Sequence, residues 1–180
     1  MYRRRSQADD EAWRPRRLNM LDFHVHLPDR ASVYLSDEAA TLELGARLGW
    51  ALPDRLIVYL RGELGAGKTT LARGVLRGLG YTGRVKSPTF TLVEVYRLSS
   101  LYLHHFDFYR FKDPNEWIDA GFRETLGADH VCLIEWPEKA GTLLPAADLE
   151  LTLEQEDTGR SARLLASSPA GTECLRQIIA

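Results

Sequence analysis

Residues 62–69, with the sequence Gly-Glu-Leu-Gly-Ala-Gly-Lys-Thr, constrain the fold of this chain more than any other stretch. They have the spacing G-x-x-x-x-G-K-[ST] of a loop that binds the phosphates of a nucleotide. Glycines at 62, 65 and 67 allow positive φ angles, so successive backbone N–H groups can point into one concavity. Lys68 adds a cation for the outer phosphates, and the hydroxyl of Thr69 is a magnesium ligand in such loops. The stretch therefore predicts nucleotide binding, provided that a strand precedes it and a helix follows it.

Both neighbours of this loop have the expected pattern. Residues 56–60 are almost entirely apolar, as in a central parallel strand that is buried on both faces. Residues 69–79 carry apolar side chains at helical spacing, so the phosphates would lie at a helix N-terminus. These elements predict an α/β, three-layer fold of the P-loop NTPase type with a central parallel sheet.

Two further apolar runs each end in a carboxylate. Residues 101–107 end at Asp107, and residues 131–135 end at Glu135. A phosphate-loop NTPase needs an acid at the carboxyl end of a neighbouring strand, where it faces magnesium and the attacking water. The two acids therefore favour hydrolysis over binding alone. The spacing does not decide which of them lies nearer the metal.

A short loop at 85–91 is rich in hydroxyl groups and contains Ser87, Pro88 and Thr89. Two interpretations are equally compatible with this composition. The loop is either a plain turn, or a switch-like loop whose hydroxyls sense the terminal phosphate or its magnesium.

The rest of the chain predicts further strands, of which 148–153 and 161–166 form an antiparallel hairpin. Apolar and polar residues alternate at 23–27, 148–153 and 161–166, and residues 92–96 form a β-rich run. Three more helices are expected: one capped by Ser36, one that begins at 113–116, and one over 171–179.

Composition gives one domain and a polar leader. The chain has 180 residues, 44% of them hydrophobic, which suffices for a single well-buried core over 21–180. Residues 1–20 are arginine-rich and lack periodicity, so they predict a disordered basic leader, with Met20 as an alternative start. The net charge of −2 gives no global case for nucleic acid or a membrane. No apolar run has membrane-spanning length and no secretory signal is evident, so we expect the cytoplasm.

The histidines do not predict a zinc site. His24 and His26 share one face of an expected edge strand, and such a pair can ligate a metal. No further histidine or carboxylate follows at a useful spacing, so we expect no zinc. Because no apolar run has membrane-spanning length, we expect no membrane partner either.

Four blocks in this order and spacing, LRGELGAGKTTLARG, VKSPTFTLVEVY, HFDFYR and LIEWP, resemble the TsaE (YjeE) family over about residues 20–166. The resemblance implies a small ATPase of bacterial threonylcarbamoyladenosine synthesis, which modifies the adenosine beside the anticodon of tRNAs that read codons beginning with A. It implies TsaD and TsaB as protein partners, with tRNA contacted only through their complex. The ATPase would reset that complex between turnovers and would be weak alone. The arginine-rich residues 1–19 depart from the compact family members.

The resemblance also implies antiparallel strands that flank the central parallel sheet, and it implies roles for single residues. Lys68, Asp107 and Glu135 would be catalytic, Thr69 and Glu135 would hold Mg²⁺, and Ser87, Pro88 and Thr89 would form the switch-like loop. ATP or ADP would be bound by Glu63, Leu64, Gly65, Ala66, Gly67, Lys68, Thr69, Thr70 and Trp136.

Three other functions stay open from the residues alone. A small-molecule kinase shares the loop and the fold, but the sequence shows no clear arginine cluster for a lid. A GTP-driven switch would need the guanine-reading motif N-K-x-D, which is absent, so ATP is favoured. A direct tRNA binder would use the arginines of residues 1–19.

The sequence does not single out an arginine that stabilises the transition state. Arg110 and Arg123 are candidates within the chain, and an arginine from a partner is the alternative.

Overall fold

The computed structural model describes residues 23–99, 101–122, 126 and 130–180. The predicted basic leader at 1–20 and the candidate Arg123 lie outside the described residues, so both remain predictions. Within the described part, no helix combines the length and the apolar character that crossing a membrane requires.

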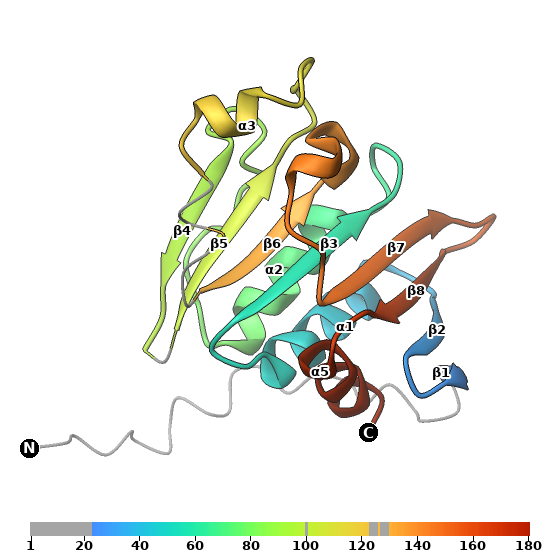
Figure 1. Ribbon diagram of the computed structural model, residues 1–180. Helices are drawn as coiled ribbons and strands as arrows, with labels where there is room; N and C mark the ends of the chain where they lie inside the picture. Colours follow the sequence, from blue (N-terminus) through green and yellow to red (C-terminus); the bar gives the residue numbers. More distant parts are fainter. Residues whose placement is uncertain (1–22, 100, 123–125, 127–129) are drawn as a thin grey trace, which may run out of the picture.

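Eight strands form one mixed sheet in the order β1-β2-β8-β7-β3-β6-β5-β4 (Figure 1). Strand β3 is parallel to β6 and β7, and β5 is parallel to β6, whereas the other neighbouring strands are antiparallel. The predicted α/β fold, with a central parallel sheet flanked by antiparallel strands, is confirmed. The strands are β1 (Phe23–Leu27), β2 (Arg30–Leu35), β3 (Leu56–Arg61), β4 (Val93–Arg97), β5 (Tyr102–Asp107), β6 (Val131–Glu135), β7 (Leu149–Gln155) and β8 (Arg160–Ala166).

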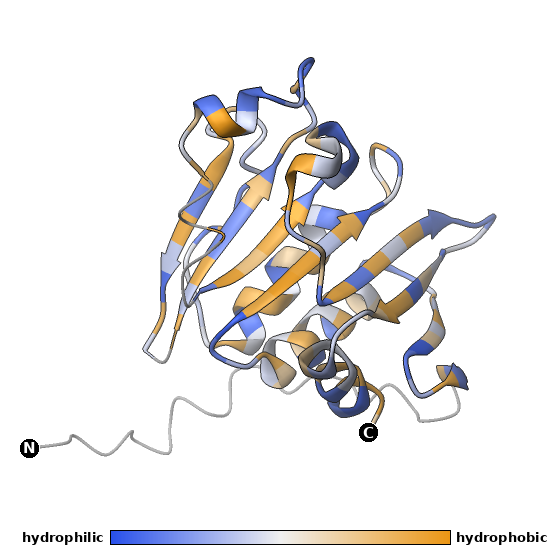
Figure 2. Ribbon diagram, in the orientation of Figure 1, coloured by the Kyte–Doolittle hydropathy of each residue, from blue (hydrophilic) through white to orange (hydrophobic). Residues whose placement is uncertain are grey.

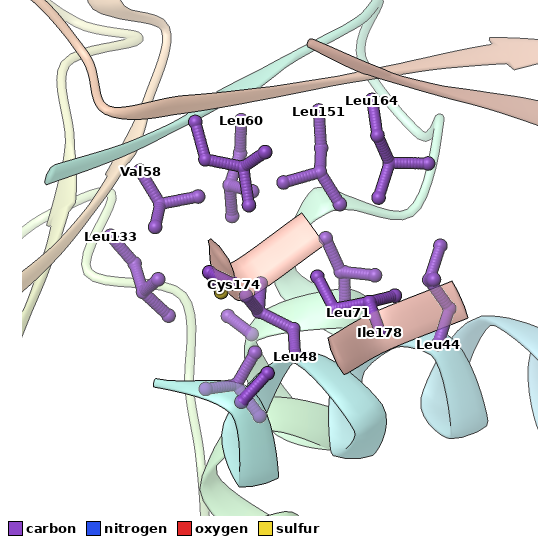
Figure 3. Packing of buried hydrophobic residues seen from close by; sticks show 14 of the residues in the cluster. Leu44, Leu48, Val58, Leu60, Leu71, Leu133, Leu151, Leu164, Cys174 and Ile178 are labelled. Atoms are coloured by element: carbon purple, nitrogen blue, oxygen red, sulfur yellow. The ribbon is translucent and has the colours of Figure 1, made fainter. Parts of the chain in front are cut away.

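Helices and turns cover both faces of the sheet (Figure 1). The longer helices α1 (Glu38–Ala51), α2 (Lys68–Gly78) and α5 (Pro169–Ile179) share one buried cluster with the sheet. Figure 3 shows this cluster, in which Leu71 of α2 and Ile178 of α5 lie beneath the leucines of the strands. The other face is covered by shorter elements, α3 (Glu116–Asp119), η2 (Pro137–Lys139) and η3 (Gly141–Leu143), together with the loops around them.

Strand β3 explains why its sequence is nearly all apolar. Its side chains alternate between the two faces: Val58 and Leu60 belong to the cluster under the long helices, and Ile57 and Tyr59 to the cluster on the opposite face. Figure 2 shows β3 largely in the hydrophobic colour, while β7 alternates along its length. Burial of one such leucine or isoleucine side chain contributes about 1.5–3 kcal/mol, so β3 anchors the loop that follows it.

Two helical glycines let α1 and α2 pack backbone to backbone. A Cβ atom on Gly45 would lie 2.3 Å from the carbonyl oxygen of Leu71, and one on Gly74 would lie 2.3 Å from that of Leu42. These distances exclude any side chain at either position without movement of a helix. The close contact holds α2, and therefore the end of the phosphate loop, in a fixed place.

Two expectations about helix starts were wrong, and one strand was not predicted. The N-cap of α1 is Asp37 instead of Ser36, because Asp37 has the extended backbone of a cap and its Oδ1 accepts from Ala40 N at 2.8 Å. The helix expected from 113 begins at Glu116 and has four residues. Its start is delayed because Glu116 Oε1 accepts the Lys112 and Asp113 N–H groups, which stabilises a turn there. Strand β2 was not predicted, although Ala31, Val33 and Leu35 alternate into the core.

Candidate functional site

The loop between β3 and α2 has the backbone that its glycines predicted. Gly62, Gly65 and Gly67 have φ angles of 134°, 83° and 106°, all in the region that favours glycine. Gly67 is the N-cap of α2, so the loop delivers its N–H groups at the N-terminus of an eleven-residue helix. A Cβ atom on Gly67 would lie 2.1 Å from Arg160 Nη1, the end of a flexible side chain that can move aside, so the positive φ is the main reason for glycine there.

Lys68 is buried and is engaged by its own loop. Its Nζ donates to the carbonyl oxygens of Gly62 at 2.5 Å and Glu63 at 2.9 Å. It also lies 4.0 Å from the centroid of the Trp136 ring, within the range of a cation–π contact. Burial lowers the pKa of Lys68, and the nearby carboxylates of Glu135 and Asp107 oppose that shift. The cation therefore sits at the loop, held by dipoles and an aromatic face.

The structure brings the two predicted acids together beside the loop. Parallel pairing places Asp107 of β5 opposite Glu135 of β6, and Glu135 opposite Leu60 of β3. Both carboxylates are buried. The carboxyl ends of these strands are where ligands bind in open α/β sheets. The chain therefore presents a cation, a hydroxyl and two carboxylates at one edge of the sheet.

Glu135 is held from two sides. Its Oε1 accepts a hydrogen bond from Thr69 Oγ1 at 3.0 Å and lies 2.8 Å from His105 Nε2. Thr69 belongs to the first turn of α2, whereas His105 belongs to β5. The pair that was expected to hold magnesium, Thr69 and Glu135, is thus in direct contact.

Asp107 is bound to the loop at 85–91. Its Oδ2 accepts from Ser87 Oγ at 2.8 Å and from Thr89 Oγ1 at 2.6 Å, and its Oδ1 accepts from Tyr109 N at 2.9 Å. Pro88 lies between the two hydroxyl residues, and its carbonyl accepts from Leu92 N at 2.7 Å. The predicted switch-like residues therefore lie on one of the predicted catalytic carboxylates.

Two non-glycine residues with left-handed backbones flank these acids. Trp136, with φ 58°, follows Glu135 directly, and Leu92, with φ 65°, accepts a hydrogen bond from Asp107 N at 3.1 Å. Such conformations cost of order 1–3 kcal/mol each, and they concentrate at functional sites. Here one strained residue directly follows Glu135, and the other is hydrogen-bonded to the backbone of Asp107.

The oxygen donors beside the loop fit a magnesium ion that is shared with bound phosphates. They fit less well a metal ion whose ligands all come from the protein. No group of three or more histidine, cysteine or acidic side chains able to hold a metal occurs among the described residues. Magnesium is usually bound by one or two carboxylates together with substrate phosphates. The contact between the Thr69 hydroxyl and the Glu135 carboxylate provides such hard oxygen donors next to the phosphate loop. His26, from the histidine pair considered above, lies on the edge strand β1, where its Nε2 is 3.1 Å from Oγ of Ser32 on β2.

Three residues near the loop were missed at the sequence level. Arg160 Nη1 donates to the Ala66 carbonyl at 3.1 Å, and Gln155 Nε2 donates to that of Gly65 at 3.4 Å. Both come from the β7–β8 hairpin, about ninety residues along the chain, so no local pattern signals them. His105 could have been found, because strand alternation places it on the same face as Asp107, two residues later.

The remaining predicted residues are dispersed around the site. Leu64 at the loop is 68% exposed, and Thr70 is half-buried in the first turn of α2. The Arg110 guanidinium lies 4.2 Å from the centroid of the Phe90 ring, and no hydrogen bond from it to either carboxylate is present among the described residues.

Comparison with known proteins agrees with this geometry. The family model "Threonylcarbamoyl adenosine biosynthesis protein TsaE" matches residues 35–163. A Haemophilus influenzae protein named tRNA threonylcarbamoyladenosine biosynthesis protein TsaE is 43% identical over 143 residues, covering 77% of this chain and 90% of that protein. A Nostoc protein of the same name is 44% identical over 133 residues, covering 71% of this chain and 80% of that protein.

A solved structure shares the fold as well as the sequence. The crystal structure of Bacillus subtilis YdiB superposes with a TM-score of 0.70 at 27% identity, and the match covers 86% of this chain and 97% of that one. The family model spans the phosphate loop, both acid-ended strands and the hydroxyl-rich loop between them. The chain therefore belongs to the TsaE family of threonylcarbamoyl adenosine biosynthesis proteins.

Proposed function

We propose that this protein hydrolyses ATP in order to support repeated turnover of a TsaD–TsaB complex during tRNA N6-threonylcarbamoyladenosine synthesis in the cytoplasm. The observation that carries the proposal is the contact between Thr69 Oγ1 and Glu135 Oε1, at 3.0 Å, beside a phosphate loop and a second carboxylate. Family membership supports the pathway. The modified adenosine lies next to the anticodon of tRNAs that read codons beginning with A.

Binding of the triphosphate would be the task of the loop and Lys68. The loop N–H groups and the N-terminus of α2 supply partial positive charge. The lysine ammonium has three donors, two of which are directed at the carbonyls of Gly62 and Glu63. An anion beside the loop would compete with those carbonyls for Nζ, so Lys68 would link phosphate binding to the shape of the loop.

Thr69 and Glu135 would hold Mg²⁺ against the phosphates. When bound, the ion neutralises charge that develops on the phosphate oxygens. Asp107 would accept a hydrogen bond from the attacking water or from a metal-bound water, and so would orient it for in-line attack on the terminal phosphate. Its Oδ1 already accepts the Tyr109 N–H, which fixes the carboxylate plane.

The hydroxyls of Ser87 and Thr89 would couple this centre to a mobile state of the loop at 85–91. In the described conformation both donate to Asp107 Oδ2. If Asp107 turns toward water, those hydroxyls must find other acceptors, and the terminal phosphate offers them. The loop would then differ between the ATP-bound and ADP-bound states.

A partner would complete the site. Arg160 is engaged with the Ala66 carbonyl and Arg110 with the Phe90 ring, so neither is free for the terminal phosphate in this conformation, and Arg123 lies outside the described residues. An arginine supplied by another protein raises phosphoryl-transfer rates by about 10³–10⁵-fold in related systems. With such an arginine supplied by TsaD or TsaB, the chain would be a weak ATPase by itself, and tRNA would be contacted through the complex.

Phosphate release, measured for the chain alone and with purified TsaD and TsaB, tests the proposal. We expect slow release alone, a strong increase with both partners, and a preference for ATP over GTP. No stimulation under any condition would contradict the proposal. A small-molecule kinase is the alternative, and transfer of labelled phosphate to a small acceptor instead of water would favour it.

A further inference from the structure

His105 is the second hydrogen-bond partner of Glu135 and has no place in the phosphate-loop motif. Its Nε2 lies 2.8 Å from Glu135 Oε1, and both side chains are buried, at 0% and 3% exposure. The other ring nitrogen, Nδ1, has no hydrogen-bond partner within the described part of the chain. Because the carboxylate oxygen accepts, the arrangement fits the tautomer with its proton on Nε2. Among the described residues, His105 is therefore a buried donor whose side chain has this carboxylate as its one polar contact.

The position of His105 is fixed by the sheet. Its backbone pairs with Leu133 of β6, two residues before Glu135, so donor and acceptor lie diagonally across neighbouring parallel strands. Donors held on strands keep their place better than donors on loops. Thr69, the other partner of Glu135, is itself a proposed metal ligand and must face the ion. His105 is left as the donor that only orients the carboxylate.

We propose that His105 is a positioning residue that aims Glu135 at Mg²⁺ and thereby sets the magnesium requirement of the nucleotide site. The inference rests on the proposed function. Groups that hold a metal-ligating side chain in place by hydrogen bonding typically change metal affinity by 10–100-fold when they are lost. A histidine that merely filled space in the core would have no such effect.

Three substitutions separate orientation from packing. Glutamine places its amide nitrogen where histidine has Nε2, so His105→Gln keeps a donor within reach of Glu135. Asparagine places its amide near the position of Nδ1, so His105→Asn keeps an amide but not a donor within reach of Glu135. His105→Leu has no donor at all. His104→Leu is the matched control, because the neighbouring residue points to the opposite face of β5, where it stacks on His130.

The measurement is ADP binding by calorimetry, first with EDTA and then at increasing Mg²⁺ concentration. We expect ADP affinity in EDTA to stay within about threefold of wild type in all four variants, since the loop contacts are intact. The Mg²⁺ concentration for half-maximal enhancement should rise about 10–100-fold in His105→Leu and His105→Asn, with recovery in His105→Gln. His104→Leu should behave as the wild type.

Each other outcome has a definite meaning. An unchanged magnesium requirement in His105→Leu overturns the positioning role while leaving the proposed function intact. If His105→Leu does not fold, equal magnesium requirements in the glutamine and asparagine variants overturn it. A wild-type protein whose ADP binding ignores Mg²⁺ contradicts the metal site itself, and with it the proposed function.

Discussion

The Nζ atom of Lys68 lies 4.0 Å from the centroid of the Trp136 ring while it donates hydrogen bonds to two carbonyls of its own loop. The lysine of the phosphate loop and the residue after Glu135 are thus in contact across two elements. A change in the direction of Nζ must alter the surroundings of the indole ring. Trp136 is therefore a natural reporter of phosphate binding at this site.

Lys68→Ala should weaken ADP and ATP binding by at least about tenfold, because a hydrogen bond to a charged group contributes about 1.5–3 kcal/mol. Nucleotide titration by calorimetry measures the loss, and the change in Trp136 fluorescence on binding should shrink with it. Arg73→Ala is the control on the same helix, since Arg73 pairs with Glu38 at the surface and should change affinity little. Equal affinities in Lys68→Ala and wild type would remove Lys68 from the site.

Nucleotide binding should take up protons at alkaline pH. Burial lowers the pKa of Lys68 in the free protein, and phosphates beside Nζ would raise it again, so part of the lysine population gains a proton on binding. For the same reason stability should rise with pH from the lowered value toward the ordinary value of about 10.4, where the unfolded chain binds more protons.

Calorimetry in two alkaline buffers with different ionisation enthalpies measures this proton uptake. Lys68→Arg should show none, because arginine stays protonated. Proton release by the wild type, or uptake equal in Lys68→Arg, would mean that another group is responsible.

Glu135→Ala should lower turnover by at least about 100-fold, while nucleotide binding in EDTA largely survives. The substitution removes the proposed metal ligand and leaves the Thr69 and His105 donors without their acceptor. Phosphate release and ADP affinity, measured side by side, separate the two effects. Glu154→Ala is the control, because Glu154 pairs with Arg163 on the exposed hairpin. Full ATPase activity in Glu135→Ala would end the magnesium assignment.

Thr89→Val and Ser87→Ala should lower turnover about tenfold or more, with nucleotide affinity changed only a few-fold. Each removes one donor from Asp107 Oδ2 and so loosens the coupling between the loop and the carboxylate. Thr91→Val is the matched control, since its hydroxyl donates to Glu94 at the surface. Turnover that is as little affected by Thr89→Val and Ser87→Ala as by the control would favour the interpretation of 85–91 as a plain turn.

The features that could be predicted from the sequence either have short-range causes or follow from a general rule of sheet topology. The phosphate loop, β3 and α2 follow from glycine geometry and from two distinct apolar periodicities. The neighbourhood of Asp107 and Glu135 followed from a topological rule, that parallel strands bring their carboxyl ends to one edge. The choice between Ser36 and Asp37 as the cap of α1 did not follow, because two adjacent residues had equal capping ability and only the backbone angles decided.

Contacts between distant segments could not be predicted in this way. Arg160 reaches the Ala66 carbonyl only because β8 pairs with β7, which lies beside β3. The contact between His105 and Glu135 depends on the register between β5 and β6, and no local sequence pattern predicts that register. Sequence patterns thus predicted which residues meet at the candidate site, and the strand register decides the contacts that support them.

In the proposed function, ATP turnover by this chain lets a TsaD–TsaB complex act repeatedly. The most direct test is to count threonylcarbamoyladenosine formed per complex, with tRNA and the activated threonylcarbamoyl donor in excess. With the wild-type chain and ATP the count should rise well above one, whereas without the chain, or with Glu135→Ala, it should stop near one. A count that is the same with and without the chain would contradict the account.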